Sequence, residues 1–265
     1  MSILTERDKS RIRSLLTKKG RRQHRQFLAE GVRLLEESLR HNFLPATIFF
    51  SPAELNERGQ SLIGRFREFG VPVQSISRKE LFQLADTETP QGLIALFDEP
   101  EHSVKQYLTR KYFRALLLDS IADPGNAGTL LRSALAFGFD LALLGPGTVD
   151  QFSPKTIRAS SGAVFGLPII RIEPENLNHL KESEPVLMMA ADINGMNLNL
   201  IKAERFRQGR LILAVGSEAT GLSGYVRAAV DELVRIPHRD TIESLNAAVA
   251  GSIIMKAIYD AGRQV

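Results

Sequence analysis

Three separated segments of this chain share one local pattern: an apolar run, then a turn containing Gly, Pro or Asn, then a helical pattern. The segments lie at residues 119–132, 215–223 and 236–246. Apolar strands that alternate with helices are typical of an α/β fold with a parallel sheet. Turns of this kind expose backbone N–H groups and carbonyls to a ligand. The sequence therefore predicts an α/β protein with a built binding site.

The composition limits the number of domains and the kinds of site that this chain can form. A chain of 265 residues with 43% hydrophobic and 24% charged residues forms one large or two ordinary globular domains. It has no apolar run of about 18 residues, and charges occupy residues 1–25, so we expect a cytoplasmic protein with no membrane partner. The absence of cysteine excludes disulfides and zinc–sulfur sites, and five scattered His predict no metal site.

Positive charge is concentrated at the N-terminus. Residues 1–25 carry nine Lys or Arg against two acidic residues, whereas the whole chain has a net charge of only +4. The rest of the chain is therefore close to neutral, and we interpret the basic segment as an arm that binds phosphate. A solvated basic helix or a transit peptide is the alternative; the two acidic residues argue against the latter. This arm is a candidate RNA contact only if the rest of the chain modifies RNA.

The first hundred residues read as a small α/β unit. Helical spacing predicts helices over 25–40, 53–69 and 78–84, and apolar runs predict strands over 46–50, 71–76 and 92–97. A polar, Pro-containing stretch at 98–105 is typical of a linker. We therefore divide the chain into domains at 1–105 and 106–265.

The second domain has the pattern of a mostly parallel sheet covered on both faces. Its predicted strands lie at 115–118, 141–144, 168–172, 186–190, 211–215 and 233–236. A dinucleotide-binding turn is rejected, because the candidate Gly145-Pro146-Gly147 contains a proline and lacks the third glycine. A Walker-type phosphate loop is also absent from the sequence.

The last predicted helix, 244–263, is apolar almost all round in its first four turns. Such a helix is expected to be covered on every side. Packing within a monomer or packing against a second subunit would both satisfy this pattern.

The three segments together resemble the motifs of the SpoU family of RNA 2′-O-methyltransferases. They read DSIADPGNAGTLLR, VGSEATGLS and IPHRDTIESLN. The resemblance implies a SPOUT fold whose C-terminal part is threaded into a deep trefoil knot, a rare exception to the rule that chains do not knot. It also implies a homodimer that uses the last helix. Departures from the commonest pattern, Ser217 and the 238–241 loop, remove no required group.

The first domain resembles, more loosely, the substrate-binding domain of many SpoU enzymes, which shares the fold of kink-turn-binding ribosomal proteins. Its local marks are the segments FLAEG at 27–31 and TETPQG at 87–92. On their own these segments would be an ordinary turn and helix start. The resemblance implies that this domain binds RNA.

S-adenosylmethionine is the cofactor that the family implies, in a pocket made by the second and third motifs. Backbone groups near Gly216, Ile236 and Leu245 would meet its adenosine part, with Leu213 and Leu222 as apolar walls. Gly216 would keep the turn free of a side chain, and Pro237 would fix the neighbouring backbone.

The polar residues that match the family's catalytic set are Asn126, Arg132, Glu218, Ser244 and Asn246. The family assigns activation of the 2′-hydroxyl to Arg132. Because arginine is almost never neutral near pH 7, we expect its guanidinium to polarise the hydroxyl and hold the adjacent phosphate rather than abstract the proton. Glu218 would orient Arg132 or the motif loops, or cap a helix. Asn126 and Asn246 would be positioners, and Ser244 either a helix N-cap or a substrate contact.

The predicted reaction is methylation of a ribose 2′-hydroxyl in structured RNA. The two-domain layout favours ribosomal RNA over transfer RNA by analogy with the family. Two other classes stay open: a non-catalytic RNA-binding protein with the same fold, and an α/β enzyme with a nucleotide cofactor. The first should have lost Asn126, Arg132 or Asn246, and this chain has all three.

Overall fold

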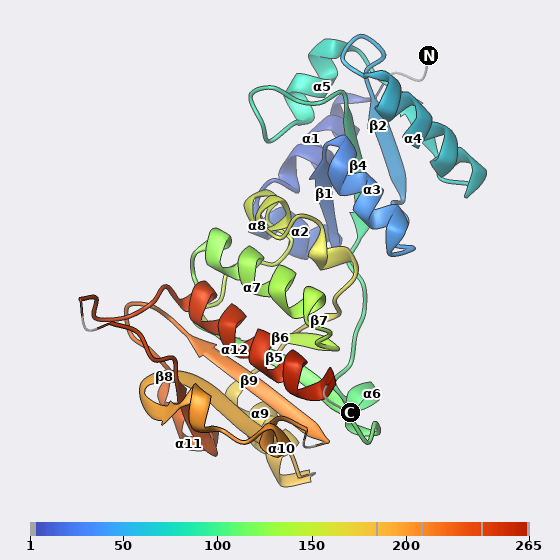
Figure 1. Ribbon diagram of the computed structural model, residues 1–265. Helices are drawn as coiled ribbons and strands as arrows, with labels where there is room; N and C mark the ends of the chain where they lie inside the picture. The colour runs from blue at the N-terminus through green and yellow to red at the C-terminus, as the bar shows by residue number, and fades with distance from the viewer. Residues whose placement is uncertain (1–3, 184, 208, 240, 264–265) are drawn as a thin grey trace. The chain divides into compact units, whose positions relative to one another are not determined.

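The structure is a computed structural model that describes residues 4–183, 185–207, 209–239 and 241–263 (Figure 1). The chain forms two compact units, one of residues 1–101 with 150–166 and the other of residues 102–149 with 167–265. The division at residue 105 counted 150–166 with the second domain, whereas this segment packs in the first unit. Among the described residues, no helix has the length and apolar character to cross a membrane.

The first unit is built on a four-stranded sheet in the order β1-β4-β2-β3. Its strands are β1 (Gln26–Glu30), β2 (Thr47–Phe50), β3 (Val73–Ser75) and β4 (Leu93–Asp98), and β4 is antiparallel to both β1 and β2. Its helices are α1 (Glu6–Ser14), α2 (Lys18–His24), α3 (Val32–Arg40), α4 (Glu57–Glu68), α5 (Arg78–Leu84) and α8 (Pro154–Ala159), with a 3-10 turn η1 (Ala163–Phe165).

The predicted helix over 25–40 was wrong in its first part. Residues 26–30 form strand β1, paired along its whole length with β4, and the helix begins only at Val32. Gly31 between them has a φ of +102°, a conformation that a helix interior does not contain and that favours glycine. The apolar run Phe27–Ala29 fits a strand or a helix equally, and pairing with Phe97, Leu96 and Ala95 of β4, 66 to 70 positions away, decided the outcome.

The segment 150–166 contributes aromatic side chains to the core of the first unit. The rings of Phe27 and Phe152 are stacked with centroids 4.2 Å apart, and the Phe165 ring lies 5.0 Å from that of Phe97. All four side chains are at most 5% exposed. The first unit therefore depends on residues that lie inside the second predicted domain in sequence.

The basic N-terminal segment is folded and is not a free arm. Helices α1 and α2 carry it, and Ile12 and Leu15 are buried in a core cluster together with residues of α5 and β4. Arg21 is only 5% exposed: its guanidinium donates to Asp150 at 2.8 and 2.9 Å and to the Leu15 carbonyl at 2.7 Å. The exposed cations of this segment are Arg7, Arg11, Arg13, Lys18, Lys19, Arg22 and Arg25.

The two sequence marks of the first unit meet in space. The Glu30 carboxylate accepts hydrogen bonds from the Thr87 hydroxyl and from the Asp86 N–H at 3.2 Å. Gly92 has a φ of +85°, and a Cβ there would lie 2.8 Å from the backbone of Glu54. The Glu30 contacts therefore close the 85–92 loop onto the end of β1.

The second unit is built on a six-stranded sheet in the order β10-β8-β9-β5-β6-β7, and every pairing is parallel, where the sequence predicted a mostly parallel sheet. The strands are β5 (Phe113–Asp119), β6 (Leu141–Leu144), β7 (Ile169–Arg171), β8 (Leu187–Asn197), β9 (Arg210–Gly216) and β10 (Glu232–Arg235). The helices are α6 (Lys105–Leu108), α7 (Pro124–Ala136), α9 (Pro174–Ser183), α10 (Ala203–Phe206), α11 (Gly224–Ala229) and α12 (Ala247–Arg263), with a 3-10 turn η2 (Leu198–Leu200).

Helices cover both faces of this sheet. Helices α7 and α12 pack side by side over one face, and α9 packs with α11 on the other (Figure 1). The apolar runs of β5 and β9 are almost completely buried between the two layers. We expected α12 to be covered on every side. In the single chain this was wrong, because Val249 and Ile253 are 46% and 38% exposed.

Candidate active site

The three motif turns gather at one edge of the six-stranded sheet. The first motif follows β5, the second follows β9 and the third follows β10, and Asp119 pairs in register with Gly216. Because the strands are parallel, their carboxyl ends share an edge, which is where open α/β sheets place their ligand sites. The sequence pattern correctly predicted that these turns meet.

Helix α7 begins in a way that fixes the first motif. Asp123 is the N-cap, and its carboxylate accepts from the Asn126 N–H at 2.7 Å. Pro124 occupies the first turn, where its missing N–H is no loss. This geometry brings Asn126, in the first turn of α7, to the edge of the sheet.

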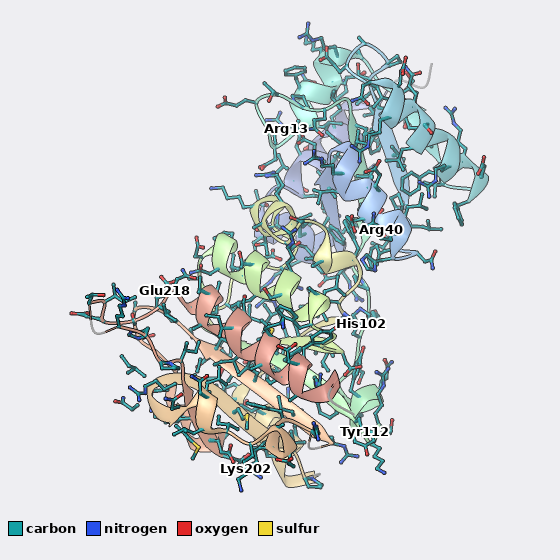
Figure 2. The ribbon with its side chains drawn as sticks, in the orientation of Figure 1. Arg13, Arg40, His102, Tyr112, Lys202 and Glu218 are labelled. Carbon is teal, nitrogen blue, oxygen red and sulfur yellow. The ribbon has the colours of Figure 1, made fainter. Side chains whose placement is uncertain are left out.

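Side chains from all three motifs join in one hydrogen-bonded network. The Asn126 amide donates to Glu218 Oε1 at 3.0 Å, and the Asn246 amide donates to Asn126 Oδ1 at 2.9 Å. Asn246 also donates to Glu218, which in addition accepts from the Ala247 N–H at 3.1 Å. Glu218, which is labelled in Figure 2, is thus the common acceptor that ties the second motif to the first and third.

Asn246 is the residue that caps the last helix. Its Oδ1 accepts from the N–H groups of Ala248 at 2.9 Å and Val249 at 3.1 Å, and α12 begins at Ala247. The interpretation of Ser244 as the N-cap was therefore wrong, since an amide two residues later performs that role. Ser244 is exposed and lies on the wall of the cavity described below. The capping role foreseen for Glu218 is present as its contact with Ala247.

Arg132 lies on α7, two turns after Asn126, with an exposed side chain. Six residues along a helix correspond to about 9 Å of axial rise, so Arg132 is displaced from the Asn126–Glu218–Asn246 network along α7. The Arg132 side chain is therefore solvent-exposed at a distance from that network.

A cavity of about 340 Å³ lies beside this network, and it is formed by residues of the second unit. Its apolar lining residues include Val215 of β9, Val234 of β10, Leu245 and Ala250 of α12. Its polar lining residues include Asp192, Ser217, Glu218, Arg227 and Ser244. An apolar cleft of this size with a few polar groups is typical of small-molecule sites.

The residues predicted to hold the donor divide into two groups. Gly216, Ile236 and Leu245 line the cavity. Leu213 and Leu222, predicted as its apolar walls, are 0% and 8% exposed, and they are packed into the protein core. Pro237 is exposed, between the lining residues Ile236 and His238.

Gly216 is required by the turn that follows it. A Cβ at this position would lie 2.6 Å from the carbonyl group of Gly221, closer than real Cβ contacts allow. The turn is closed by reciprocal backbone hydrogen bonds between Ser217 and Gly221 at 3.1 and 2.8 Å. The glycine therefore permits the tight turn that presents Glu218.

Two groups of contacts near the site were missed by the sequence analysis. Asp192 lines the cavity just after the predicted strand 186–190, and Arg227 donates to it at 2.8 Å. The rule that ligands bind at the carboxyl ends of parallel strands could have identified Asp192. Asp119, fully buried, accepts from the Ser223 N–H at 2.6 Å and the Tyr225 hydroxyl at 3.2 Å. Burial, together with the nearby Asp119 charge, raises the pKa of Tyr225 to about 12.

Comparison with known proteins agrees with this architecture. Residues 114–256 match the model of the SpoU rRNA Methylase family, and residues 10–95 match the MRM3-like substrate binding domain. The 23S rRNA (guanosine(2553)-2′-O)-methyltransferase RlmP of Bacillus subtilis is 33% identical over 245 residues, covering 92% of each chain. The 23S rRNA (uridine(2479)-2′-O)-methyltransferase of Streptomyces viridochromogenes is 28% identical, covering 90% of this chain and 83% of that one.

Among solved structures, an AdoMet-bound rRNA methyltransferase from Sinorhizobium meliloti superposes with a TM-score of 0.84 at 26% identity. The match covers 98% of this chain and 97% of that chain. The SpoU methyltransferase AviRb of Streptomyces viridochromogenes has the same fold, with a TM-score of 0.84 at 24% identity. The family matches and the arrangement of the three motif turns lead to one conclusion: the chain belongs to the SpoU rRNA methylase family.

Proposed function

We propose that this protein transfers a methyl group from S-adenosylmethionine to a ribose 2′-hydroxyl of ribosomal RNA. The observation that carries the proposal is the Asn126–Glu218–Asn246 network, which joins the three motifs beside a cavity of small-molecule size. Its relatives in Bacillus and Streptomyces are named as 23S rRNA 2′-O-methyltransferases.

The cavity suits an adenosine-containing sulfonium donor. Its lining contains the apolar residues Val234, Ile236, Leu245 and Ala250, which could pack against a purine ring, together with polar side chains that could orient the rest of the molecule. We assign the adenosine part to the Gly216–Ile236–Leu245 side, and the charged methionine end to the Asp192–Arg227 pair. When bound, the donor supplies an electrophilic methyl group and leaves as a neutral thioether.

Arg132 is assigned to the acceptor side. The ribose oxygen forms a bond to the methyl carbon as the carbon–sulfur bond breaks, and the hydroxyl proton leaves to water or to a phosphate oxygen. An exposed guanidinium next to that hydroxyl stabilises the negative charge developing on oxygen and binds the neighbouring phosphate with two donors. Glu218, Asn126 and Asn246 are positioning residues, because their hydrogen bonds are already engaged with one another.

The first unit is assigned to RNA binding. Its exposed cations on α1 and α2, among them Arg7, Arg13, Lys19 and Arg22, supply positive charge that favours phosphate contacts. Arg21 is excluded from this role because its ion pair with Asp150 is buried. The match of residues 10–95 to a substrate binding domain supports the assignment.

A homodimer is proposed from the exposed apolar face of α12. Val249 and Ile253 lie one turn apart on this face, and a monomer would leave both side chains in water. The trefoil knot and the cytoplasmic location stay predictions from the family and the sequence. Sedimentation of the full chain at micromolar concentration, compared with Val249→Asp/Ile253→Asp, tests the dimer: the double variant should sediment as a monomer.

Mapping 2′-O-methyl groups on total RNA from cells with and without the protein tests the function and distinguishes ribosomal from transfer RNA. One methylated ribosomal nucleotide should disappear without the protein, and the purified protein with S-adenosylmethionine should restore it. Calorimetry with S-adenosylmethionine, a dinucleotide and a nucleoside triphosphate separates this reading from a nucleotide-dependent enzyme. Donor binding without any methylated RNA would favour a non-catalytic RNA-binding role.

A further inference from the structure

Strand β8 contains a bulge beside the donor cavity, the cavity of about 340 Å³ described above. Leu233 and Val234 are consecutive in β10, but they pair with Ala190 and Met196, which lie six positions apart in β8. The five residues 191–195 are therefore inserted opposite that junction, and the first four of them line the cavity. Bulges are frequent beside active sites, where they redirect side chains. This bulge forms a part of the cavity lining that the three motifs do not contribute.

Two hydrogen bonds and a glycine fix the shape of this bulge. The Asp192 carboxylate accepts from the Asn194 N–H at 2.9 Å and from the Arg227 guanidinium at 2.8 Å. A Cβ at Gly195 would lie 2.4 Å from the carbonyl carbon of Leu233, so only glycine allows the two strands to approach there. The Asp192 side chain is 9% exposed and belongs to the cavity lining. The bulge therefore holds one nearly buried carboxylate at the cavity in a fixed position.

Arg235 is a second charged residue of the cavity lining, and it follows Val234 in β10. Its side chain is exposed, and within the part of the chain that the structure describes its guanidinium has no hydrogen bond or ion pair. Arg227, which also lines the cavity, is instead occupied by Asp192. Solvation alone would account for an exposed arginine, but this one shares a cavity of small-molecule size with a nearly buried carboxylate. The lining therefore combines a fixed negative group with a guanidinium that is available to an anion.

The proposed donor has charges that match these two residues. S-adenosylmethionine contains a sulfonium and an ammonium, which are positive, and one carboxylate, which is negative. The Arg235 guanidinium would repel both positive groups, whereas it binds a carboxylate through parallel N–H donors. The Asp192 carboxylate can accept further donors besides Asn194 and Arg227, because an ionised carboxylate has about four acceptor sites. The ammonium of the donor suits those remaining sites.

We infer that Asp192 and Arg235 bind the amino-acid end of S-adenosylmethionine, with the ammonium on the Asp192 carboxylate and the carboxylate on the Arg235 guanidinium. The inference rests on the proposed function for the identity of the donor. Arg227 is then a positioning residue that holds Asp192. The pair also sets the direction of the donor, because a reversed molecule would place positive groups against Arg235. An RNA phosphate is the competing ligand of Arg235, but it offers no group for Asp192.

The test compares two ligands of the full chain by calorimetry, S-adenosylhomocysteine and 5′-methylthioadenosine. Both contain thioadenosine with a neutral sulfur, but only S-adenosylhomocysteine carries the amino-acid group. Arg235→Gln should weaken S-adenosylhomocysteine binding about tenfold and change 5′-methylthioadenosine binding by less than about twofold. Arg239→Gln is the matched control, because it removes an exposed arginine of the same segment outside the cavity lining. It should change the affinity for either ligand by less than about twofold.

Asp192→Asn tests the other half of the site. Asparagine keeps an oxygen for the Asn194 N–H but removes the charge that binds an ammonium. The affinity for S-adenosylhomocysteine should fall about tenfold, and the affinity for 5′-methylthioadenosine should stay within about twofold of the wild type. Equal loss of both ligands would show that Asp192 only shapes the bulge, and it would overturn the ammonium contact.

The outcomes separate this inference from the proposed function. Unchanged S-adenosylhomocysteine affinity in Arg235→Gln overturns the inference, and a raised KM for RNA in that variant would assign Arg235 to a phosphate instead. Parallel loss of both ligands in Arg235→Gln also overturns it, because the effect would not depend on the amino-acid group. If the variants behave as expected while the wild type methylates no RNA, the Asp192–Arg235 site stands and the proposed reaction fails. A wild type that binds neither ligand contradicts both the proposed donor and the inference.

Discussion

The side-chain amide of Asn246 donates a hydrogen bond to the amide oxygen of Asn126 at 2.9 Å, across 120 positions of the chain. Both amides also donate to Glu218, so one carboxylate closes a triangle between the three motifs. None of these groups needs to carry a proton in the reaction. Their contacts instead hold the start of α12, the turn after β9 and the start of α7 in one arrangement.

Removing the common acceptor should dismantle this arrangement. Glu218→Ala leaves the amides of Asn126 and Asn246 and the Ala247 N–H without their carboxylate, so we expect methyl transfer to fall about 100-fold and donor affinity to fall with it. Glu218→Gln keeps one acceptor oxygen and should be intermediate. Methylation assays and calorimetry give both quantities, with exposed Glu243→Ala as the control from the third motif. Full activity in Glu218→Ala would show that the triangle is dispensable.

Arg132 should affect the acceptor and spare the donor. Arg132→Ala is expected to lower kcat on the order of a thousandfold while the Kd for S-adenosylmethionine changes less than about twofold. Arg132→Lys should fail almost as badly, because a point charge lacks the planar fork that holds a phosphate. Single-turnover methylation and calorimetry separate the two effects. A lysine variant that kept most of its activity would contradict the bidentate role.

Gly216 and Gly224 form a matched pair for testing the second motif. A Cβ at Gly216 would meet the Gly221 carbonyl group at 2.6 Å, whereas a Cβ at Gly224 meets no atom within 4 Å. Gly216→Ala should therefore distort the turn that carries Glu218 and weaken donor binding at least several-fold. Gly224→Ala should keep donor affinity and raise stability by up to about 1 kcal/mol. Equal donor affinity in both variants would show that the donor does not bind beside Gly216.

Arg21 and Arg22 are neighbours with opposite expected effects. Arg21→Ala breaks a buried ion pair with Asp150 and should destabilise the protein by about 3–5 kcal/mol. Arg22 is exposed, so Arg22→Ala should leave stability unchanged and lower the salt slope of RNA binding by roughly one. Denaturant unfolding and salt-dependent RNA binding measure the two effects. Normal stability of Arg21→Ala would contradict the structural role of Arg21 and favour a role in RNA binding.

Tyr225 should make stability fall at alkaline pH. Its pKa is raised from the ordinary 10 to about 12 by burial and by the nearby Asp119 charge, so the neutral phenol is favoured in the folded state. The stability this contributes is complete below pH 10 and is lost as pH rises through about 12. Tyr225→Phe should cost about 0.5–1.5 kcal/mol at neutral pH through the lost bond to Asp119, and the cost should shrink near the upper end of that window. Urea unfolding of both proteins across this window measures the difference; a constant cost at every pH contradicts the assignment.

The position of the site was predictable from the sequence, because its cues are local. An apolar run, a Gly-, Pro- or Asn-containing turn and a helical pattern recur three times, and in a parallel sheet such turns must share an edge. Gly216, Ile236 and Leu245, which the resemblance to the SpoU family indicated, line the cavity. Leu213 and Leu222 were not distinguishable from lining residues, because an apolar residue beside a site motif has the same sequence signal on either side of a strand.

Tertiary structure decided what depends on distant partners. Residues 26–30 became a strand because β4 pairs with them, and the segment 150–166 joined the first unit because Phe152 and Phe165 fill an aromatic core there. Arg21 reads as one more surface cation until Asp150, 129 positions away, is brought against it. The sequence alone determined the α/β class, the three motifs and their order, since each rests on local pattern. The register of the strands, the burial of single charges and the identity of the α12 cap are fixed by contacts between residues far apart in the chain, which no local pattern encodes.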